Sequence, residues 1–152
     1  MRIIFTVPGD PKAKARPRAT VIGGHASMYT PKKTARWESI IRETAIPKFP
    51  DGPIPAGEPV HMSVKFWFPF VGTPRKREPH PAQWLPKRED VDNLFKLVAD
   101  SLNGIAYVDD RQIVEAHIQK IRCGQNRNEP RTEVMIETKG DRPYAPEAAE
   151  VR

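Results

Sequence analysis

The chain has 152 residues, with 25 Lys or Arg against 19 Asp or Glu, and its formal net charge at pH 7 is +6. This length favours a single domain, the one cysteine (Cys123) excludes an internal disulfide, and the apolar runs fall far short of the roughly 20 residues that a membrane span needs. The first ten residues lack the long apolar stretch of a secretory signal, so we expect a cytoplasmic protein that does not associate with membranes.

The positive charge is concentrated in the first third of the chain. Residues 1–50 contain ten Lys or Arg and only three Asp or Glu, whereas residues 51–100 contain seven of each. A concentrated basic segment is an electrostatic signature of a protein that binds a polyanion such as nucleic acid. The alternative at this point is a solvated basic surface with no partner.

Along the first half of the chain, the residue pattern predicts a strand, a basic loop and a helix. Apolar side chains alternate over residues 3–7, which indicates a strand, and the turn-forming residues 8–11 (PGDP) end it. A basic loop follows over residues 12–18, and residues 23–24 (Gly-Gly) mark a further turn. Residues 32–46 carry apolar side chains three to four positions apart between two prolines, which predicts a helix.

In the second half of the chain, the residue pattern predicts three more strands, a second helix and a long loop. Strict alternation over residues 60–68 is the clearest strand signal, and residues 69–88 form a proline-rich loop without periodicity. Residues 91–102 predict a second helix with one apolar face. Alternation at residues 114–119 and a β-rich run at residues 131–138 predict two strands, and their separation by a turn suggests that they pair as a hairpin.

Because strands and helices do not alternate regularly, this order of elements favours an α+β fold over a doubly wound parallel sheet. We expect one domain over residues 1–140, built from a mixed β-sheet of about four to five strands with two main helices. The residues from 141 to 152 are expected to form a loosely ordered tail.

Acidic residues gather around the second predicted helix. Asp90 and Asp92 stand at its start, where aspartate is also an ordinary capping residue, so a capping role for either one is the alternative interpretation. Asp92 and Lys96 are four apart and share a helix face, and Asp109-Asp110 follows an apolar run that can return the chain to the same place. Carboxylates meeting there would repel each other without a cation, and oxygen ligands of this kind suit Mg²⁺ or Mn²⁺. Carboxylates, a divalent ion and a lysine are the groups that phosphodiester hydrolysis requires.

Three motifs in this chain together resemble those of the RusA family of Holliday-junction resolvases. They are Pro8-Gly9-x-Pro11-x-x-Lys14-x-Arg16-Pro17-Arg18, then Tyr29-Thr30-Pro31-Lys32-Lys33, and then Asp90-x-Asp92-Asn93-x-x-Lys96 with Asp100-x-Leu102-Asn103-Gly104 and Tyr107-x-Asp109-Asp110-x-Gln112-Ile113. The motifs span residues 8–113 in the family's order.

The resemblance implies a Mg²⁺-dependent (or Mn²⁺-dependent), homodimeric endonuclease that acts on four-way DNA junctions. By motif position, Asp90, Asp92 and Asp110 would be the essential, metal-binding carboxylates, and Lys96 would be the catalytic lysine. Family members commonly have proline before the first aspartate, whereas this chain has Glu89, which either assists the metal or faces solvent. Glu89 is therefore an accessory candidate, and Asp109, next to Asp110, is a second one.

The basic first third supplies the candidate DNA-binding residues. Lys14, Arg16 and Arg18 alternate with Ala15 and Pro17, so that an extended chain places all three on one side, as a DNA backbone requires. Lys32 and Lys33 follow at the start of the first predicted helix. Two alternatives remain open for the 14–18 segment: it is a solvated loop, or it is ordered against the acidic site, where its charges offset the carboxylates.

The sequence thus supports three functions. The first is resolution of four-way junctions in recombination and repair, which a two-fold dimer would match because two strands are cut symmetrically. The second is the same chemistry with looser specificity for branched DNA. The third is a non-enzymatic DNA-binding module, but such a module gains nothing from aspartates that repel phosphates.

Overall fold

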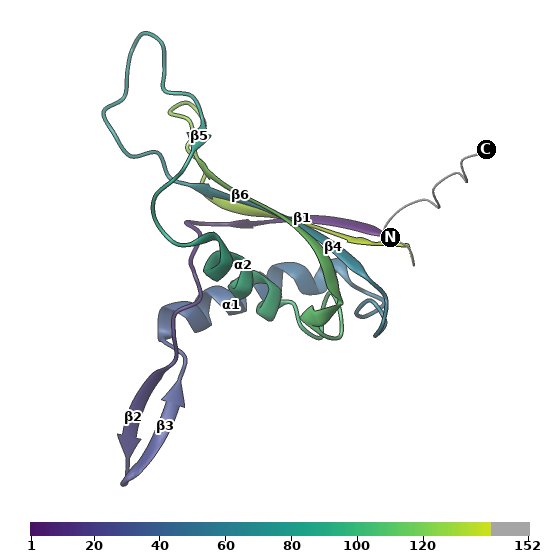
Figure 1. Ribbon diagram of the computed structural model, residues 1–152. Helices are drawn as coiled ribbons and strands as arrows, with labels where there is room; N and C mark the ends of the chain where they lie inside the picture. Colours follow the sequence, from purple (N-terminus) through teal and green to yellow (C-terminus); the bar gives the residue numbers. More distant parts are fainter. Residues whose placement is uncertain (141–152) are drawn as a thin grey trace, which may run out of the picture.

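Two helices cover one face of a five-stranded mixed sheet, and a separate two-stranded hairpin extends away from both layers (Figure 1). The structure is a computed structural model that describes residues 1–140, so the tail expected over residues 141–152 lies outside the described residues. The strands are β1 (Arg2–Pro8), β2 (Arg18–Ile22), β3 (His25–Tyr29), β4 (Val60–Phe68), β5 (Gln83–Trp84), β6 (Ile113–Arg122) and β7 (Arg131–Thr138). The helices are α1 (Lys32–Ala45) and α2 (Val91–Ser101), and the short 3-10 turns are η1 (Ile46–Lys48) and η2 (Asp110–Gln112). The expected α+β class is therefore confirmed.

The order of strands in the main sheet is β1-β7-β4-β6-β5, with β4 and β6 parallel and β4 and β7 antiparallel. The expected hairpin between the last two strands is wrong, because β4 lies between β6 and β7. Neighbouring strands lie about 4.8 Å apart, so the connection over residues 123–130 has to cross only about 10 Å, which its length easily allows. The parallel β4–β6 pair in turn requires a long crossover connection, and α2 lies within it.

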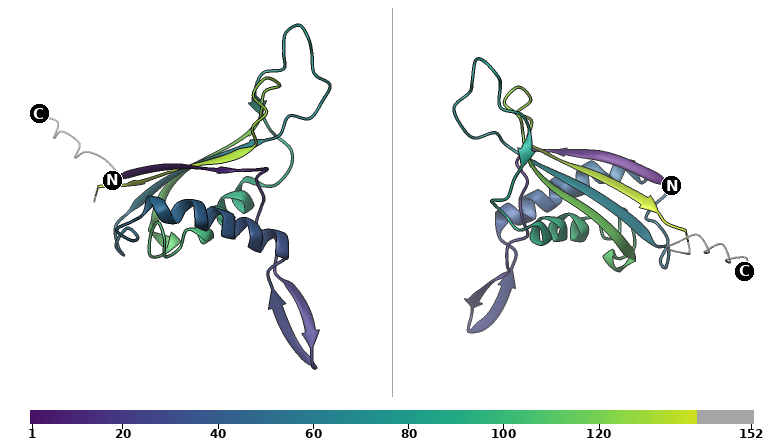
Figure 2. Two further views of the ribbon diagram at one scale, coloured as in Figure 1. Left: turned by 180° about the vertical axis from the view of Figure 1, so that it is seen from behind. Right: turned by 45° about the horizontal axis from the view of Figure 1, so that its top comes forward.

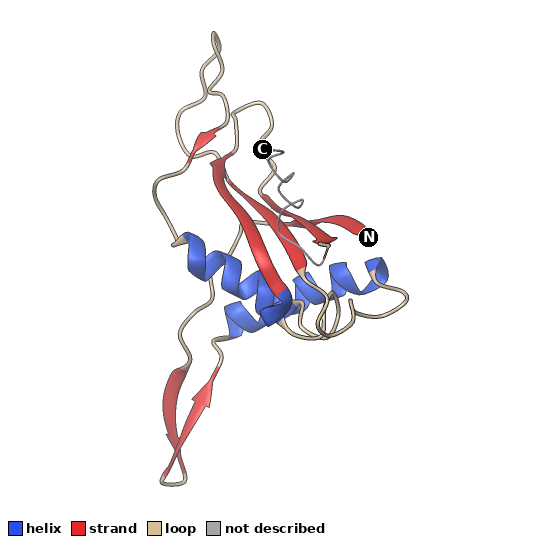
Figure 3. Ribbon diagram, turned by 45° about the vertical axis from the view of Figure 1, so that its right-hand side comes forward, coloured by secondary structure: helices blue, strands red, loops and turns tan. Residues whose placement is uncertain are grey.

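The central strand β4 carries the core of the protein. Its five alternate side chains are fully buried, as the alternation predicted: Val60, Met62, Val64, Phe66 and Phe68. The helices bury their apolar faces against the same side of the sheet (Figure 3). The buried helix residues are Trp37, Ile41 and Ala45 of α1 and Leu94, Leu97 and Val98 of α2. None of the helices within residues 1–140 has the length and apolar character needed to cross a membrane.

The hairpin β2–β3 lies in the segment where the sequence predicted only a basic loop and a turn. Its two strands pair antiparallel, from Arg18 opposite Tyr29 to Ile22 opposite His25. Gly23 and Gly24 make the two-residue turn with φ values of 57° and 82°, a left-handed geometry at both positions that glycine adopts without strain. The hairpin projects beyond the layers in both views of Figure 2.

The segment between α2 and β6 brings the second acidic motif back to the helix. Tyr107 is fully buried, and its hydroxyl donates a hydrogen bond of 2.7 Å to the carbonyl of Ala99 in α2. The Gln112 side chain donates to the carbonyls of Pro55 and Glu58, at 2.8 and 3.1 Å. This segment is therefore fastened on two sides, and η2 begins at Asp110 beside α2.

Candidate active site

The start of α2 presents two carboxylates to solvent. Asp90 is the N-cap residue and Asp92 lies in the first turn, and both residues are exposed. An N-cap aspartate usually accepts a hydrogen bond from a backbone amide of the first turn, but the side chain of Asp90 makes no such bond. The capping interpretation of Asp90 thus loses its main support.

About two turns further along α2, Asp100 lies between two lysines. Lys96 approaches it from one turn earlier, with Nζ 3.6 Å from Asp100 Oδ1. Lys14, which is 86 positions away in the sequence, donates a hydrogen bond from Nζ to Asp100 Oδ2 and lies 3.8 Å from Glu38 Oε1. The Lys96 side chain remains 62% exposed, so it keeps the freedom to approach a ligand.

Asp110 faces Asp100, and the two carboxyls titrate as a pair. Partial burial raises the pKa of Asp110, and the hydrogen bond and negative charge of Asp100 raise it further. Burial also acts to raise the pKa of Asp100, but the hydrogen bond and charge of Lys14, followed by the hydrogen bond from Asp110, outweigh it and lower the pKa. A proton at this pair therefore resides on Asp110, and Lys14 keeps Asp100 ionised.

Asp109, the neighbour of Asp110, has a structural function. Its side chain accepts a hydrogen bond from the backbone amide of Arg111 and, together with Gln112, completes a capping box around η2. The Arg111 guanidinium also donates to it at 2.9 Å, and these backbone and side-chain bonds lower the pKa of Asp109. Its carboxylate oxygens are thus already engaged, whereas those of Asp110 are not used in a cap.

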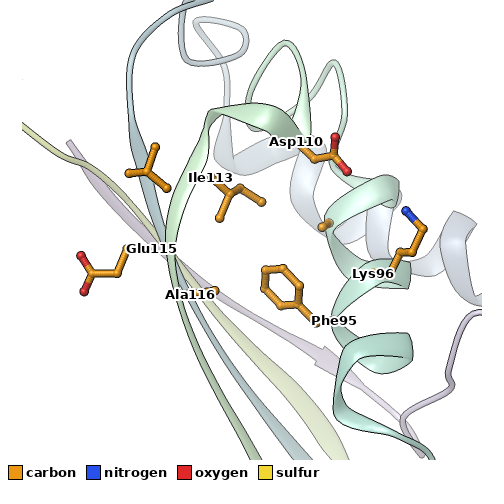
Figure 4. Close-up of a pocket in the computed structure, with 8 residues that line it drawn as sticks. Phe95, Lys96, Asp110, Ile113, Glu115 and Ala116 are labelled. Carbon is orange, nitrogen blue, oxygen red and sulfur yellow. The ribbon is translucent and has the colours of Figure 1, made fainter.

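A hollow of about 390 Å³ opens between α2 and the first half of β6. Figure 4 shows the apolar side chains of Phe95 and Ile113 lining its floor, with Lys96 of α2 and Asp110 of η2 at its rim. The remaining lining residues are Ala99, Val114, Glu115 and Ala116. A lysine and an aspartate with a raised pKa therefore meet at the edge of a concave, partly apolar surface, which is a typical setting for a functional site.

Glu89 precedes the α2 carboxylates and is only partly engaged. Its Oε1 accepts a bond of 3.2 Å from Arg88, and Arg88 also pairs with Asp10 at 3.4 Å and lies 4.7 Å above the Phe68 ring. The second carboxylate oxygen, Oε2, is buried and has no hydrogen-bond partner among residues 1–140. An orphaned carboxylate oxygen is costly unless a cation or water satisfies it.

The donor set fits a hard divalent cation. Asp90, Asp92, Asp100, Asp110 and Glu89 offer only carboxylate oxygens, which suit Mg²⁺ or Mn²⁺ rather than softer ions, and the unpartnered Glu89 oxygen agrees with this chemistry. Within the described residues, however, no three carboxylates, histidines or cysteines are close enough to hold an ion together. The structure brings Asp110 to Asp100 rather than into one cluster with Asp90 and Asp92.

The five candidate DNA-binding residues separate into two groups. Lys14 is ion-paired inside the acidic face, as one of the two alternatives for this segment anticipated. The others are exposed and have no ion-pair partner within residues 1–140: Arg16, Arg18, Lys32 and Lys33.

Asp100 is the one residue of this site for which the sequence analysis predicts no function. Its spacing of four from Lys96 and eight from Asp92 places it on their face of α2, so the sequence alone could have identified it as a candidate. Its pairing with Lys14 and Asp110 could not be predicted in this way, since both contacts depend on the tertiary fold.

Comparison with known proteins identifies a family and a relative. Residues 8–137 match the family model described as "Endodeoxyribonuclease RusA". The chain is also similar to the uncharacterized protein YqaN of Bacillus subtilis (strain 168), with 34% identity over 140 residues. That alignment covers 88% of this chain and 94% of the relative.

Proposed function

The chain belongs to the RusA family of endodeoxyribonucleases, and from this premise we propose that it resolves four-way (Holliday) DNA junctions by Mg²⁺-dependent phosphodiester hydrolysis. The observation that carries the proposal is the Asp100–Asp110 pair beside Lys96, at the rim of the hollow next to α2. Two carboxyls held this close repel each other when both are ionised, and such pairs with shifted pKa values are frequent at functional sites.

The metal-binding residues of the proposal are Asp90, Asp92 and Asp110, with Glu89 as an accessory. Because these carboxylates do not form one cluster within residues 1–140, an ion would have to draw Asp110 and the α2 carboxylates together as it binds. A divalent ion bound by these carboxylates would activate water and stabilise the charge that develops on the phosphate oxygens. The uncapped carboxylate of Asp90 and the unpartnered oxygen of Glu89 support this assignment.

The lysines have separate functions in the proposal. Lys96, which is largely exposed next to Asp110, neutralises the negative charge of the scissile phosphate. Lys14 instead stays inside the protein's own acidic face, where it keeps Asp100 ionised and holds the basic segment against α2. The unpaired cations Arg16, Arg18, Lys32 and Lys33 then contact the DNA backbone.

A homodimer is part of the proposal because a four-way junction offers two equivalent strands to cut. An open strand edge supports it. The two-residue β5 pairs only with Ile121 and Arg122 of β6, so the outer edge of the first half of β6 has no strand partner within residues 1–140. Val114 on this edge is 64% exposed, and an open apolar edge favours association with another chain.

The test is to incubate the protein with a labelled four-way junction and, separately, with a linear duplex of the same sequence, with and without Mg²⁺. We expect symmetrical nicks in the junction only when Mg²⁺ is present, with Mn²⁺ as a substitute. Equal cleavage of flaps and junctions would instead indicate a nuclease of looser specificity for branched DNA. Binding without cleavage in either metal would indicate a non-enzymatic module.

A further inference from the structure

The β2–β3 hairpin is an arm that does not pack on the core. Nine of its ten strand residues are exposed and the remaining one, Thr20, is only partly covered. At about 3.3 Å per residue, its strands extend for roughly 16 Å, and Figure 1 shows the arm pointing away from the sheet and helices. An isolated two-stranded hairpin is marginally stable in water, so a partner that covers this arm would stabilise it.

The two faces of the arm differ in chemistry. The cross-strand register places Ala19 opposite Met28 and Val21 opposite Ala26, which makes one face wholly apolar. The other face carries Arg18 opposite Tyr29, Thr20 opposite Ser27 and Ile22 opposite His25. At the tip, Val21 and Ile22 are 73% and 68% exposed, so the end of the arm is the most apolar part of an exposed element.

Charge indicates which partner covers the arm. Residues 11–37 contain seven Lys or Arg and no Asp or Glu. Four of these cations, which have no ion-pair partner within residues 1–140, flank the base of the arm: Arg16, Arg18, Lys32 and Lys33. Two arms packed on each other in a two-fold dimer would bring these like charges together, whereas a polyanion neutralises them.

The arm also begins next to the proposed active site. The backbone amide of Lys14, four residues before β2, donates a hydrogen bond of 3.1 Å to the carbonyl of Asn93 in the first turn of α2. The base of the arm is thereby attached beside Asp92. A DNA strand whose phosphate lies at the α2 carboxylates therefore has the arm within reach of its neighbouring nucleotides.

We propose that the β2–β3 hairpin inserts into branched DNA and that Val21 and Ile22 at its tip separate the stacked base pairs at the branch point. A two-stranded ribbon has the width that the major groove admits, and apolar side chains inserted between base steps unstack them in other DNA-bending proteins. The cations at the base of the arm hold the flanking phosphates. This inference rests on the proposed function, since it assumes that the protein binds four-way junctions.

The experiment uses a four-way junction with 2-aminopurine at the branch point, whose fluorescence rises when the base unstacks. The protein carries Asp92→Asn to prevent cleavage, with and without the double change Val21→Thr and Ile22→Thr, which keeps both side chains β-branched. Ile4→Thr is the matched control, because Ile4 is 59% exposed on β1, outside the arm. We expect a fluorescence rise with Asp92→Asn alone and with the Ile4 control, and loss of that rise with the double change. The affinity of the double variant falls by less than about tenfold, because all cations are retained.

Each other outcome overturns the inference in a distinguishable way. An undiminished fluorescence rise with the double variant, bound to the junction, shows that the arm does not unstack bases, and leaves the proposed function intact. Conversion of a dimer to a monomer by the double change, measured by sedimentation, shows that a second copy covers the arm. Failure of the Asp92→Asn protein and of the unmodified protein to bind any junction removes both the inference and the proposed function. Because the arm makes no core contacts, an unchanged melting temperature confirms that the double variant is folded.

Discussion

The salt dependence of junction binding separates the two groups of basic residues in the N-terminal segment. Consider Ala substitution of the four unpaired cations, Arg16, Arg18, Lys32 and Lys33, in one variant, and Lys14→Ala in another. Each phosphate contact on duplex DNA contributes about −0.9 to the slope of log affinity against log salt. Loss of four contacts thus reduces the magnitude of the slope by about three to four units. Lys14 is held between Asp100 and Glu38, so its removal leaves the slope unchanged.

The assay is fluorescence anisotropy with a labelled four-way junction at several salt concentrations, with Ca²⁺ in place of Mg²⁺ to suppress cutting. The Lys14→Ala variant is the matched control, because it also removes positive charge from the same segment. An unchanged slope in the fourfold variant would refute the assignment of this surface to DNA. A slope reduced by about one unit in Lys14→Ala would show that its ion pairs open in the complex.

Three further predictions follow from the acidic site and the open sheet edge. In chelator, Asp110→Asn raises the melting temperature at pH 7 by up to about 4 °C, since relieving repulsion between partly exposed charges is worth at most about 1 kcal/mol. Burial and Asp100 raise the pKa of Asp110, so protonated Asp110 favours the folded state, and this contribution is lost as the pH rises through the folded-state pKa. The difference in melting temperature between the Asp110→Asn variant and the unmodified protein therefore disappears below about pH 4, the ordinary pKa of an aspartate. A variant that melts at a lower temperature than the unmodified protein at pH 7 would contradict this. Asp109→Ala keeps most of the junction-cleaving activity but lowers the melting temperature, because alanine cannot accept the hydrogen bond by which the Asp109 side chain caps η2. Complete loss of cleavage in a folded Asp109→Ala protein would place Asp109 among the essential groups. Sedimentation of the unmodified protein at micromolar concentration gives twice the chain mass of 17.2 kDa, and a monomer with and without DNA would exclude the dimer.

Much of the fold was predictable because burial leaves a periodic trace in the sequence. The central strand β4 buries every second side chain, and α2 buries one stripe, so the alternation over residues 60–68 and the helical spacing over residues 91–102 gave both elements. The β2–β3 hairpin left no such trace, because neither of its faces packs on the core. The pairing of β6 with β4 depends on long-range packing, so sequence proximity wrongly favoured β7 as its partner.

The candidate site likewise has one part that the sequence predicts and another that only the tertiary structure shows. The spacing of Asp92, Lys96 and Asp100 on one helix face is a local property, and the sequence contains it directly. The contact of Lys14 with Asp100 joins residues 86 positions apart, and no local pattern predicts it. The distinct functions of Asp109 and Asp110 also required the structure, because only the capping box shows that Asp109 is engaged.

The most direct test of the account is the cleavage of a labelled four-way junction by the Asp92→Asn variant in Mg²⁺. The change removes one negative charge while keeping the size of the side chain, and Asp92 is exposed in the first turn of α2, so the fold is retained. Asp51→Asn, at an exposed position in the turn after η1, is the matched control. The account predicts that Asp92→Asn binds the junction as tightly as the unmodified protein but does not cleave it, while the control does both. Near-normal cleavage by Asp92→Asn would contradict the central claim that the carboxylates of α2 hold the metal that drives hydrolysis.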